Sequence, residues 1–402
     1  MAAVPEANPA AAPPLRRTPV LFIQRPTHRR RQRDTVLACP PEIEVLTTLT
    51  EPAYDEIAVF TKSVSPSGRL RAALIRGLVA VNARKLPKAW RDSAMLVYTW
   101  GFIPLGITHR AVIECDTPYV LSLYGVTWFR LARPLLRRLL LRDQCAGIVC
   151  ISAACRTALL AELGSSLSAK AHIVYPVPPD AGPSAVRVDG EPLRLLFVST
   201  QFILKGGREL VGAVRALVAE GHHVEMTMVT DVVAASAFVR PDDRFIRLLS
   251  ATMPREQLRR DMFSTSHVLV HPTLQDSFGM VLLEGLASGL PIVTTDLFAA
   301  DEMVLPGMNG ALVEPPVRYY AKDKRAVWSW WGIDVEKRLT AMEFPAFATA
   351  LADAIRPMLN ERYRRGLSDG SRALFASRFA PDVRTASFLR ALGIQPSPHV
   401  EA

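Results

Sequence analysis

Cysteine is scarce in this sequence. Five of the 402 residues are cysteine, no two of them form a CxxC pair, and no local histidine cluster accompanies them. Disulfide frameworks need paired cysteines, and zinc sites need clustered ligands. We therefore expect reduced cysteines, as in a cytoplasmic protein, and no metal site.

Long apolar runs are also missing. No stretch reaches the roughly 18 apolar residues that a membrane-spanning helix needs. Residues 1–18 are rich in Ala and Pro and lack the apolar core of a signal peptide. We expect a disordered tail over 1–18 and a protein that stays in the cytoplasm, soluble or peripheral on a membrane.

Acidic residues are outnumbered, with 38 Asp and Glu against 48 Lys and Arg, which gives a formal net charge of +10. Such an excess attracts nucleic acid, anionic lipid headgroups or phosphorylated substrates. Because the sequence has no aromatic–basic interleaving and no known nucleic-acid-binding motif, we expect no nucleic-acid partner. The basic residues concentrate in the segments 29–33 and 128–142.

Segment 128–142 allows two interpretations. Its leucines and one tryptophan alternate with Arg130, Arg133, Arg137, Arg138 and Arg142. A helix of this kind can lie in a membrane interface with its apolar face down and its arginines on lipid phosphates. It can equally be an ordinary helix that covers a sheet, with a buried leucine face and solvated arginines. Both interpretations stay open at this point.

The chain alternates short apolar runs with helical patterns, which predicts parallel sheets covered on both faces. The expected strands of the first half are 19–24, 95–100, 119–124, 147–151 and 172–175, and the expected helices are 70–83, 127–143 and 153–163. The expected strands of the second half are 193–198, 223–229, 245–249, 267–271, 291–295 and 310–313, and the expected helices are 207–220, 254–264, 280–288, 344–360 and 381–392.

A segment dense in Pro and Gly, 176–192, separates the two halves and is typical of a linker. We predict two Rossmann-like α/β domains, an N-terminal one over 19–185 and a C-terminal one over 186–380. The last segment, 381–402, is expected to hold a helix that crosses back to the first domain, followed by a tail.

The informative segment, 270–296, has the pattern of strand, loop, helix, turn and strand. Ligands of open parallel sheets bind at the carboxyl ends of strands, and a helix N-terminus binds phosphate through its free N–H groups. Ser277 and Gly279 stand where those groups would be, and glycine lets a phosphate approach closely. Asp276 before the helix and Glu284 within it can accept hydrogen bonds from sugar hydroxyls.

A second loop suits a diphosphate. It lies between the first strand and the first helix of the C-terminal half and ends Lys205–Gly206–Gly207. Lysine supplies a mobile point charge, and the glycines open backbone amides to a ligand.

These two loops together resemble the signature of glycosyltransferase family 4, the group 1 glycosyltransferases of the GT-B fold. That signature has two glutamates separated by seven residues around a Phe-Gly step, followed by Gly-x-Pro and an apolar run. Here it reads from Asp276 through Phe278–Gly279 to Glu284, and then Gly289–Val293. Segments 302–304 and 307–310 continue the similarity, like the family's Glu-Ile-Val and Asp-Gly-x-Asn-Gly steps.

The resemblance implies a GT-B fold with two domains facing each other across a cleft that holds donor and acceptor. It implies a nucleoside-diphosphate sugar as donor substrate, no cofactor, no metal, and transfer with retention of configuration. Asp276 and Lys205 would be the catalytic residues, with Asp276 at the donor sugar and Lys205 at the diphosphate. The expected donor-binding residues are Thr200, Lys205, Gly206, Ser277, Phe278, Gly279 and Glu284, the last on the ribose.

Two departures from the family pattern bear on activity. The first glutamate is Asp276, one methylene shorter, and the family's Gly-Arg step is Ser199–Thr200. Arg208 or a basic residue of the other domain would have to replace the missing arginine.

On the acceptor side, the resemblance points to the one dense polar group of the first half, His109, Glu114 and Asp116. The alternative interpretation is a turn with a solvated histidine and two acids at a strand end.

The function predicted from the sequence is transfer of a sugar to an acceptor hydroxyl in polysaccharide or glycolipid synthesis. The partners would be a nucleotide-sugar donor, a glycan or lipid-linked acceptor and an anionic membrane surface. Two alternatives remain open, a nucleotide-sugar epimerase of the same fold and a non-catalytic, degenerate glycosyltransferase.

Overall fold

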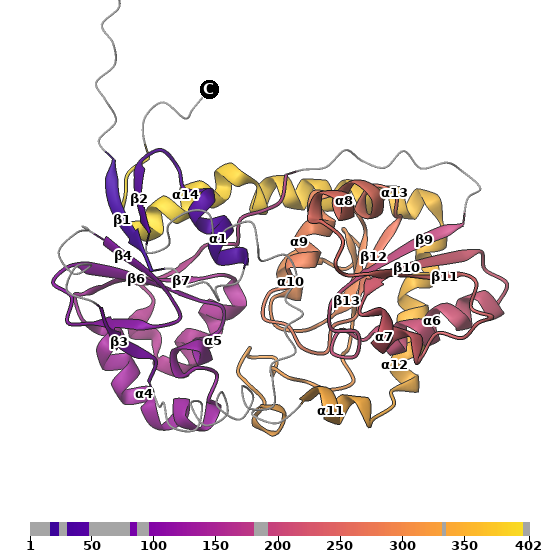
Figure 1. The fold of residues 1–402 in the computed structure, drawn as a ribbon, viewed down its shortest axis with the longest axis horizontal. Coiled ribbons are helices and arrows are strands. Elements are labelled where there is room, and N and C mark those ends of the chain that lie inside the picture. Colours follow the sequence, from indigo (N-terminus) through magenta and orange to yellow (C-terminus); the bar gives the residue numbers. More distant parts are fainter. Residues whose placement is uncertain are drawn as a thin grey trace, which may run out of the picture.

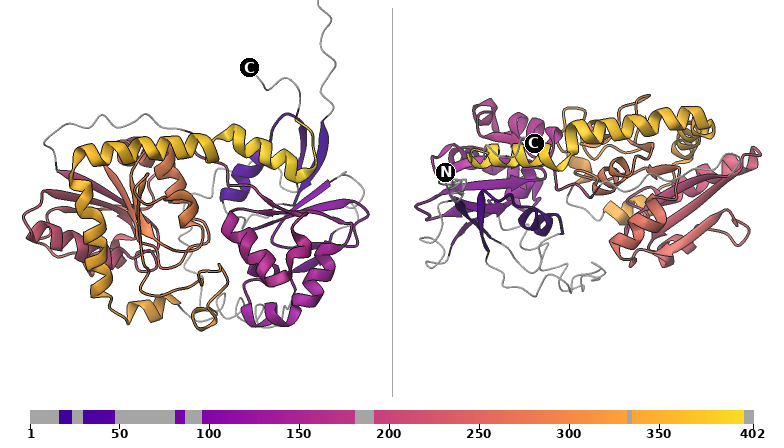
Figure 2. Two further views of the ribbon diagram at one scale, coloured as in Figure 1. Left: turned by 180° about the vertical axis from the view of Figure 1, so that it is seen from behind. Right: turned by 90° about the horizontal axis from the view of Figure 1, so that it is seen from above.

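The computed structural model describes residues 17–23, 30–47, 81–86, 96–180, 192–331 and 335–396. Two α/β domains lie side by side, and the helices α13 (Glu361–Leu374) and α14 (Pro381–Leu392) run along one edge of both (Figures 1 and 2). The predicted fold class, two Rossmann-like domains with parallel sheets, is confirmed.

The described part of the N-terminal domain contains a parallel sheet of strand order β2-β1-β4-β6-β7-β8. Its strands are β1 Thr18–Phe22, β2 Ile43–Thr47, β4 Leu96–Trp100, β6 Arg110–Cys115, β7 Cys145–Cys150 and β8 Ala171–Ile173. Its helices are α1 Arg30–Leu37, α4 Val126–Leu141 and α5 Ala153–Leu163. Two short strands, β3 Ala83–Lys85 and β5 Ile103–Leu105, pair in parallel beside this sheet.

The C-terminal domain contains a second parallel sheet, of strand order β11-β10-β9-β12-β13-β14. Its strands are β9 Leu193–Val198, β10 Val224–Thr230, β11 Ile246–Ser250, β12 Val268–His271, β13 Ile292–Thr295 and β14 Gly310–Val313. Its helices are α6 Gly207–Ala219, α7 Val232–Ser236, α8 Arg255–Leu258, α9 Met280–Ala287, α10 Ala300–Met303, α11 Val335–Thr340, α12 Pro345–Ile355 and α13 Glu361–Leu374.

Three inner strands are buried along their whole length because helices cover both faces of each sheet. Every residue of β4, β12 and β13 is buried. The strand order of the C-terminal sheet reverses at β9, since β10 and β11 extend on one side of it and β12 to β14 on the other. Such a switch point leaves a crevice at the carboxyl ends of the two central strands, where ligands of this fold class bind.

The predicted strand 119–124 is wrong. Pro118–Ser122 forms a short 3₁₀ turn, and Leu123 and Tyr124 follow it with φ of +53° and +63°. Left-handed backbone of this kind cannot continue a strand. The strand of this region is β6, which precedes the turn and was not among the expected strands.

Several predictions fall at the limits of the described residues. The expected helix 70–83 lies outside them, apart from 81–83, where Ala83 begins β3 rather than ending a helix. The predicted domain boundary between residues 185 and 186 also lies outside the described residues. Thr18 belongs to β1 and not to the tail. The helix α14 Pro381–Leu392 packs on the N-terminal domain, where Arg384 donates a hydrogen bond to the Ala38 carbonyl.

Candidate functional site

The crevice of the C-terminal sheet brings two distant loops together. Lys205, in the loop after β9, lies with its Nζ 2.8 Å from Oδ2 of Asp276, in the loop after β12. The same ammonium donates a hydrogen bond to the Gln275 carbonyl. Because β9 and β12 are neighbours, their following loops meet at one edge of the sheet. The two residues expected to be catalytic therefore form one charged pair.

The Asp276 carboxylate is held by the start of the next helix. Its Oδ1 accepts hydrogen bonds from the backbone N–H groups of Ser277 at 2.9 Å and Phe278 at 3.3 Å. Burial raises the pKa of Asp276, but the nearby Lys205 charge and His271 outweigh burial and hold the pKa well below its usual value. This carboxylate is therefore ionised and fixed in orientation at neutral pH.

His271 is a part of this group that sequence reasoning missed. It ends β12, is buried, and stacks on Phe197 with ring centroids 6.1 Å apart. Its Nε2 lies 3.8 Å from Oδ2 of Asp276, which is too long for a hydrogen bond. Burial lowers the pKa of His271 despite the nearby carboxylate. The imidazole of His271 is therefore neutral and lies buried beside the Lys205–Asp276 pair.

Two glycines shape the loops. Gly206 has φ of +69° and precedes α6, and a Cβ there would lie 2.2 Å from the Pro272 carbonyl oxygen. Gly279 has φ of +92° and precedes α9. Left-handed backbone without steric penalty is available to glycine alone. Only glycine at 206 lets the loop that carries Lys205 approach the loop that carries Asp276.

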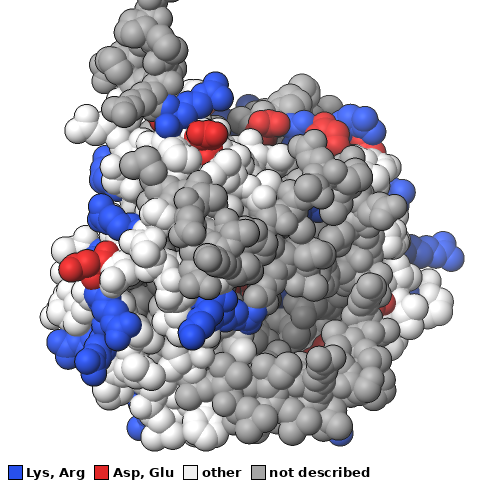
Figure 3. All heavy atoms as spheres, turned by 60° about the vertical axis from the view of Figure 1, so that its left-hand side comes forward, with Lys and Arg blue, Asp and Glu red and all other residues white. Residues whose placement is uncertain are grey.

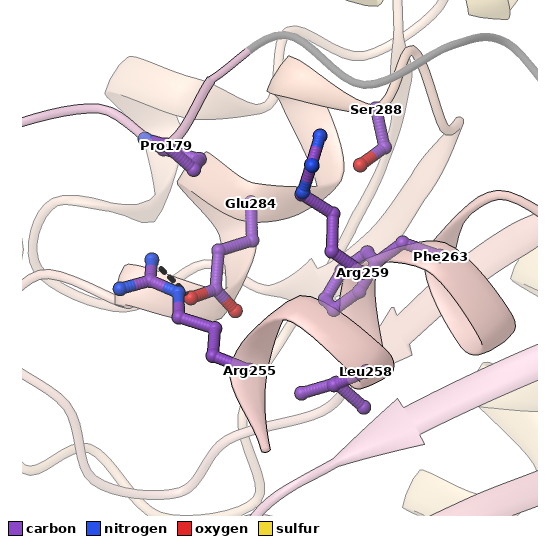
Figure 4. A pocket seen from close by; sticks show the side chains of 7 residues that line it. All are labelled: Pro179, Arg255, Leu258, Arg259, Phe263, Glu284 and Ser288. Carbon is purple, nitrogen blue, oxygen red and sulfur yellow. Dashed lines mark ion pairs between the residues drawn. The ribbon is translucent and has the colours of Figure 1, made fainter.

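Glu284 points from α9 toward a narrow pocket beside Arg255 of α8 (Figure 4). The guanidinium of Arg255 forms an ion pair with Glu284 and also lies 3.8 Å from Asp34 of α1 in the N-terminal domain. Besides this pair, the residues lining the pocket are Pro179, Leu258, Arg259, Phe263 and Ser288. Arg255, which no sequence motif indicated, connects Glu284, an acid expected at the donor site, with the other domain.

Three residues bear on the arginine that is missing from the family pattern. Thr200 is exposed in the same loop as Lys205. Arg208 donates hydrogen bonds to Glu209 and to the Thr340 carbonyl, so its guanidinium is held at α6 and α11. The expectation that Arg208 takes over this role is not supported. Arg255 is the cation placed beside Glu284.

Two acids lie at the carboxyl end of β6. Glu114 is buried, lies 3.0 Å from the Arg31 guanidinium and accepts a hydrogen bond from the Tyr98 hydroxyl at 2.7 Å. Asp116 follows the strand and accepts hydrogen bonds from the Thr117 N–H and the Tyr124 hydroxyl, both at 2.8 Å. Each carboxylate has its own donors, and both acids lie at a strand end, as the alternative interpretation also expected. Arg31, from the basic segment 29–33, was not expected here.

The structure does not bring His109 to these acids. His109 precedes β6, whereas Glu114 and Asp116 lie at its other end. At about 3.3 Å per residue of strand, the five residue steps from His109 to Glu114 span well over 10 Å, and Asp116 lies two steps further along. His109 therefore does not form one cluster with Glu114 and Asp116, because an extended strand separates residues that are near in sequence, and a role of His109 at the acceptor stays a prediction.

The acids of the two domains act on a common tyrosine. Burial raises the pKa of Tyr320 well above its usual value, and the charges of Asp116 and Asp276 raise it further. Tyr320 belongs to the segment after β14 and is 3% exposed. Tyr320 is therefore under the electrostatic influence of one acid from each domain.

A glutamate joins the two domains. The Glu302 carboxylate, on α10, accepts hydrogen bonds from the backbone N–H groups of Ala153 and Ala154 at 2.7 Å each. It also accepts one from the Tyr175 hydroxyl at 2.9 Å. Ala153 and Ala154 begin α5 of the N-terminal domain, where free N–H groups and the helix dipole favour an anion. Glu302 thus caps a helix of the opposite domain.

The described residues show neither a metal site nor a membrane-spanning helix. They contain no group of three or more His, Cys, Asp or Glu side chains that could hold a metal ion. None of their helices is both long enough and apolar enough to cross a bilayer. The expected absence of a cofactor stays a prediction.

The architecture of two facing Rossmann-like domains is that of the GT-B class, and solved structures bear this out. HepE from Anabaena, in complex with UDP and glucose, aligns with a TM-score of 0.57 and 13% identity over 93% of this chain and 99% of that chain. A glycosyltransferase from Rickettsia africae aligns with a TM-score of 0.57 and 14% identity over 93% and 97%. At these identities the likeness establishes the fold.

Residues 192–323, most of the C-terminal domain, match the family model described as Glycosyl transferases group 1. This match confirms the suspected group 1 resemblance for that domain, and the finer assignment to family 4 stays a prediction. A curated relative, the capsular polysaccharide biosynthesis glycosyltransferase CapM of Staphylococcus aureus, is 24% identical over 112 residues. The match spans 27% of this chain and 30% of that relative.

Proposed function

We propose that this protein is a glycosyltransferase that moves a sugar from a nucleoside-diphosphate sugar to an acceptor hydroxyl. One observation carries the proposal. The Lys205–Asp276 pair, at 2.8 Å, lies at the switch point of a sheet whose domain matches group 1 glycosyltransferases. A cation and an ionised acid in that crevice suit a substrate that combines a diphosphate with sugar hydroxyls.

The proposed roles follow from the geometry. Breaking the bond between sugar and diphosphate builds negative charge on the leaving phosphate, and Lys205 stabilises it as a preorganised cation. Asp276, fixed by two backbone N–H groups, accepts hydrogen bonds from the donor sugar. Glu284 binds the ribose hydroxyls, and Arg255 supplies the guanidinium that Thr200 does not. Gly206, Ser277, Phe278 and Gly279 shape the donor-side backbone.

The acceptor is proposed to bind against Glu114 and Asp116. Tyr124 and Thr117 hold the Asp116 carboxylate in place, so one of its lone pairs can orient an incoming hydroxyl. Proteins of the same fold include one in complex with UDP and glucose and an outer-core galactosyltransferase of lipopolysaccharide. With the capsular relative, they support a glycan or lipid-linked acceptor.

We further propose that transfer retains the anomeric configuration, without a metal or other cofactor. The resemblance to retaining group 1 enzymes supports this assignment. We also propose a cytoplasmic location with peripheral contact to an anionic membrane, for which the net charge of +10 is the first support.

Incubation of the full chain with a panel of nucleoside-diphosphate sugars tests the function. The measurement is release of free nucleoside diphosphate, with and without glycan or lipid-linked acceptors, together with mass spectrometry of the products. Glycosylated acceptor with stoichiometric diphosphate supports the proposal. Interconversion of one donor into its epimer without transfer would establish the epimerase instead, and binding without turnover would establish a degenerate transferase.

A further inference from the structure

The outer face of α4 carries apolar side chains where a sheet-covering helix would carry polar ones. The inner face, Val126, Phe129, Ala132, Leu136, Leu139 and Leu140, is buried. On the opposite face Leu131 is 70% exposed, Leu135 50% and Trp128 39%. Residues 128, 131 and 135 recur at helical spacing, so they form one stripe. Single exposed leucines need no explanation, but a contiguous stripe marks an interaction surface.

Arginines accompany this stripe. Arg130, Arg137, Arg138 and Arg142 are exposed on the outer face of α4 or at its end, and the helix contains no acidic residue. The remaining arginine, Arg133, pairs with Glu162 and is partly buried. Arg137, Arg138 and Arg142 form no ion pair with any residue that the structure describes. Figure 3, which looks toward the N-terminal domain, shows Lys and Arg gathered on the described surface among few acids.

The surface continues onto the C-terminal domain. The Arg130 guanidinium lies 4.8 Å from the ring centroid of Trp328, which begins the turn Trp328–Trp330. The Arg338 guanidinium lies 4.0 Å from the ring centroid of Trp330. In Figures 1 and 2, α4 and the segment leading into α11 lie along one edge of the molecule, opposite α13 and α14. Tryptophan and arginine side by side are typical of a membrane–water interface.

We propose that this edge of the molecule, the α4 surface, docks on an anionic phospholipid bilayer. Guanidinium groups bind lipid phosphates through paired hydrogen bonds, while Leu131, Leu135 and Trp128 enter the boundary between headgroups and acyl chains. Charge complementarity selects the partner, since the stripe is accompanied by cations alone on its helix. Contact through both domains would set the region between them directly above the membrane. The inference rests on the membrane contact proposed above and assigns it to this surface, and a failure of vesicle binding would leave the proposed sugar transfer untouched.

Flotation of the full chain with liposomes tests the proposal. Vesicles of phosphatidylglycerol mixed with phosphatidylcholine are compared with vesicles of phosphatidylcholine alone at low and high salt. We expect binding to the anionic vesicles that falls with salt. Because each basic residue near an anionic surface contributes about a fivefold factor in partitioning, the double variant Arg137→Glu/Arg138→Glu should bind at least about tenfold more weakly.

Two further variants separate insertion from simple charge attraction. Leu131→Ser/Leu135→Ser keeps every arginine and should also weaken binding about tenfold or more. The matched controls are Arg362→Glu/Arg365→Glu, on α13 at the opposite edge, and Val233→Ser, at a valine that is 84% exposed on α7. Both controls should bind like the wild type, and circular dichroism should show that all variants are folded.

Brominated lipid gives a second readout that does not depend on affinity. Bromine in the upper acyl chain should quench tryptophan fluorescence of bound protein, and Trp128→Phe should remove part of that quenching. Failure to bind anionic vesicles at any salt would overturn the proposal. So would equal loss in the α13 control, full binding by Leu131→Ser/Leu135→Ser, or binding of soluble polyglutamate without binding of vesicles, which would indicate an acidic protein partner.

Discussion

At the scale of single residues, the site is a small set of charges whose states are fixed by their neighbours. Lys205 and Asp276 neutralise each other, while His271 stays neutral beneath them because it is buried. Local sequence could identify Lys205, Asp276 and Glu284, since each belongs to a motif. It could not identify Arg31, Arg255 or His271, whose roles arise from contacts with residues far away in the chain.

The shorter acid at 276 gives a first prediction. Asp276→Glu restores the residue typical of the family and should leave the rate of transfer unchanged or raise it, whereas Asp276→Asn should lower it because the charge is lost. Initial rates with the active donor provide the measurement. Loss of all activity in Asp276→Glu would show instead that the pocket is built around the shorter side chain.

His271 gives a prediction about pH. Its folded-state pKa lies below the unfolded value, so on acidification the unfolded chain takes up a proton that the folded protein excludes. The stability from this residue is fully present above the unfolded pKa of about 6.5 and is lost as pH falls below it, by at most about 1.4 kcal/mol per pH unit.

Chemical unfolding of the wild type and of His271→Asn between pH 7.5 and 5.5 tests this loss of stability with falling pH. The wild type should lose more stability over the interval than the variant does. His109→Asn, at the amino end of β6, serves as the control and should behave like the wild type. Parallel pH curves for the wild type and His271→Asn would contradict the account.

At the scale of elements, the strands of the C-terminal domain were predictable almost residue by residue, whereas its helices α7, α10, α11 and α13 were not among the expected elements. Its strands are short apolar runs separated by clear breaks, and β9, β14 and α14 have the predicted bounds. In the N-terminal domain the apolar run 119–124 was mistaken for a strand. Pro118 and the left-handed Leu123 and Tyr124 turn the chain there, and such backbone angles cannot be read from hydrophobicity.

The loop before α6 gives a prediction at this scale. Gly206→Ala should lower the free energy of unfolding by about 2 kcal/mol or more, because φ is positive and the new Cβ would collide with the Pro272 carbonyl. Gly366→Ala is the control, since it is exposed within α13 and its Cβ would meet nothing within 4 Å. That change should stabilise the protein by about 0.5–1 kcal/mol. Equal effects of both substitutions would contradict the close approach of the two loops.

At the scale of the whole molecule, the contacts between the domains are specific and polar. Glu302 caps α5, the Tyr119 hydroxyl accepts a hydrogen bond from the Ala326 N–H at 2.7 Å, and Arg255 connects Glu284 with Asp34. None of these contacts follows from a local sequence pattern, because the partners in the two domains are about 150 to 220 residues apart. The sequence predicted that the domains face each other only through the family resemblance.

Glu302→Ala tests how strongly the domains are coupled. It leaves two N–H groups at the start of α5 without an acceptor, which should cost about 2 kcal/mol or more. We expect the calorimetric melting transition to shift down and to broaden or split as the domains uncouple. Glu314→Ala, at an exposed ion pair with Arg318, should leave the transition almost unchanged. An unaltered transition in Glu302→Ala would show that other contacts hold the domains together.

The central claim is that sugar transfer takes place at Lys205, Asp276 and Glu284. Its most direct test is the turnover of Lys205→Ala and Glu284→Gln with the donor and acceptor that the wild type uses. The controls are Lys322→Ala and Glu225→Gln, at exposed residues of the same domain. Since losing one preorganised charge contact costs on the order of 3 kcal/mol, each site variant should be about a hundredfold slower while both controls keep wild-type rates. Near-normal turnover in both site variants would contradict the account.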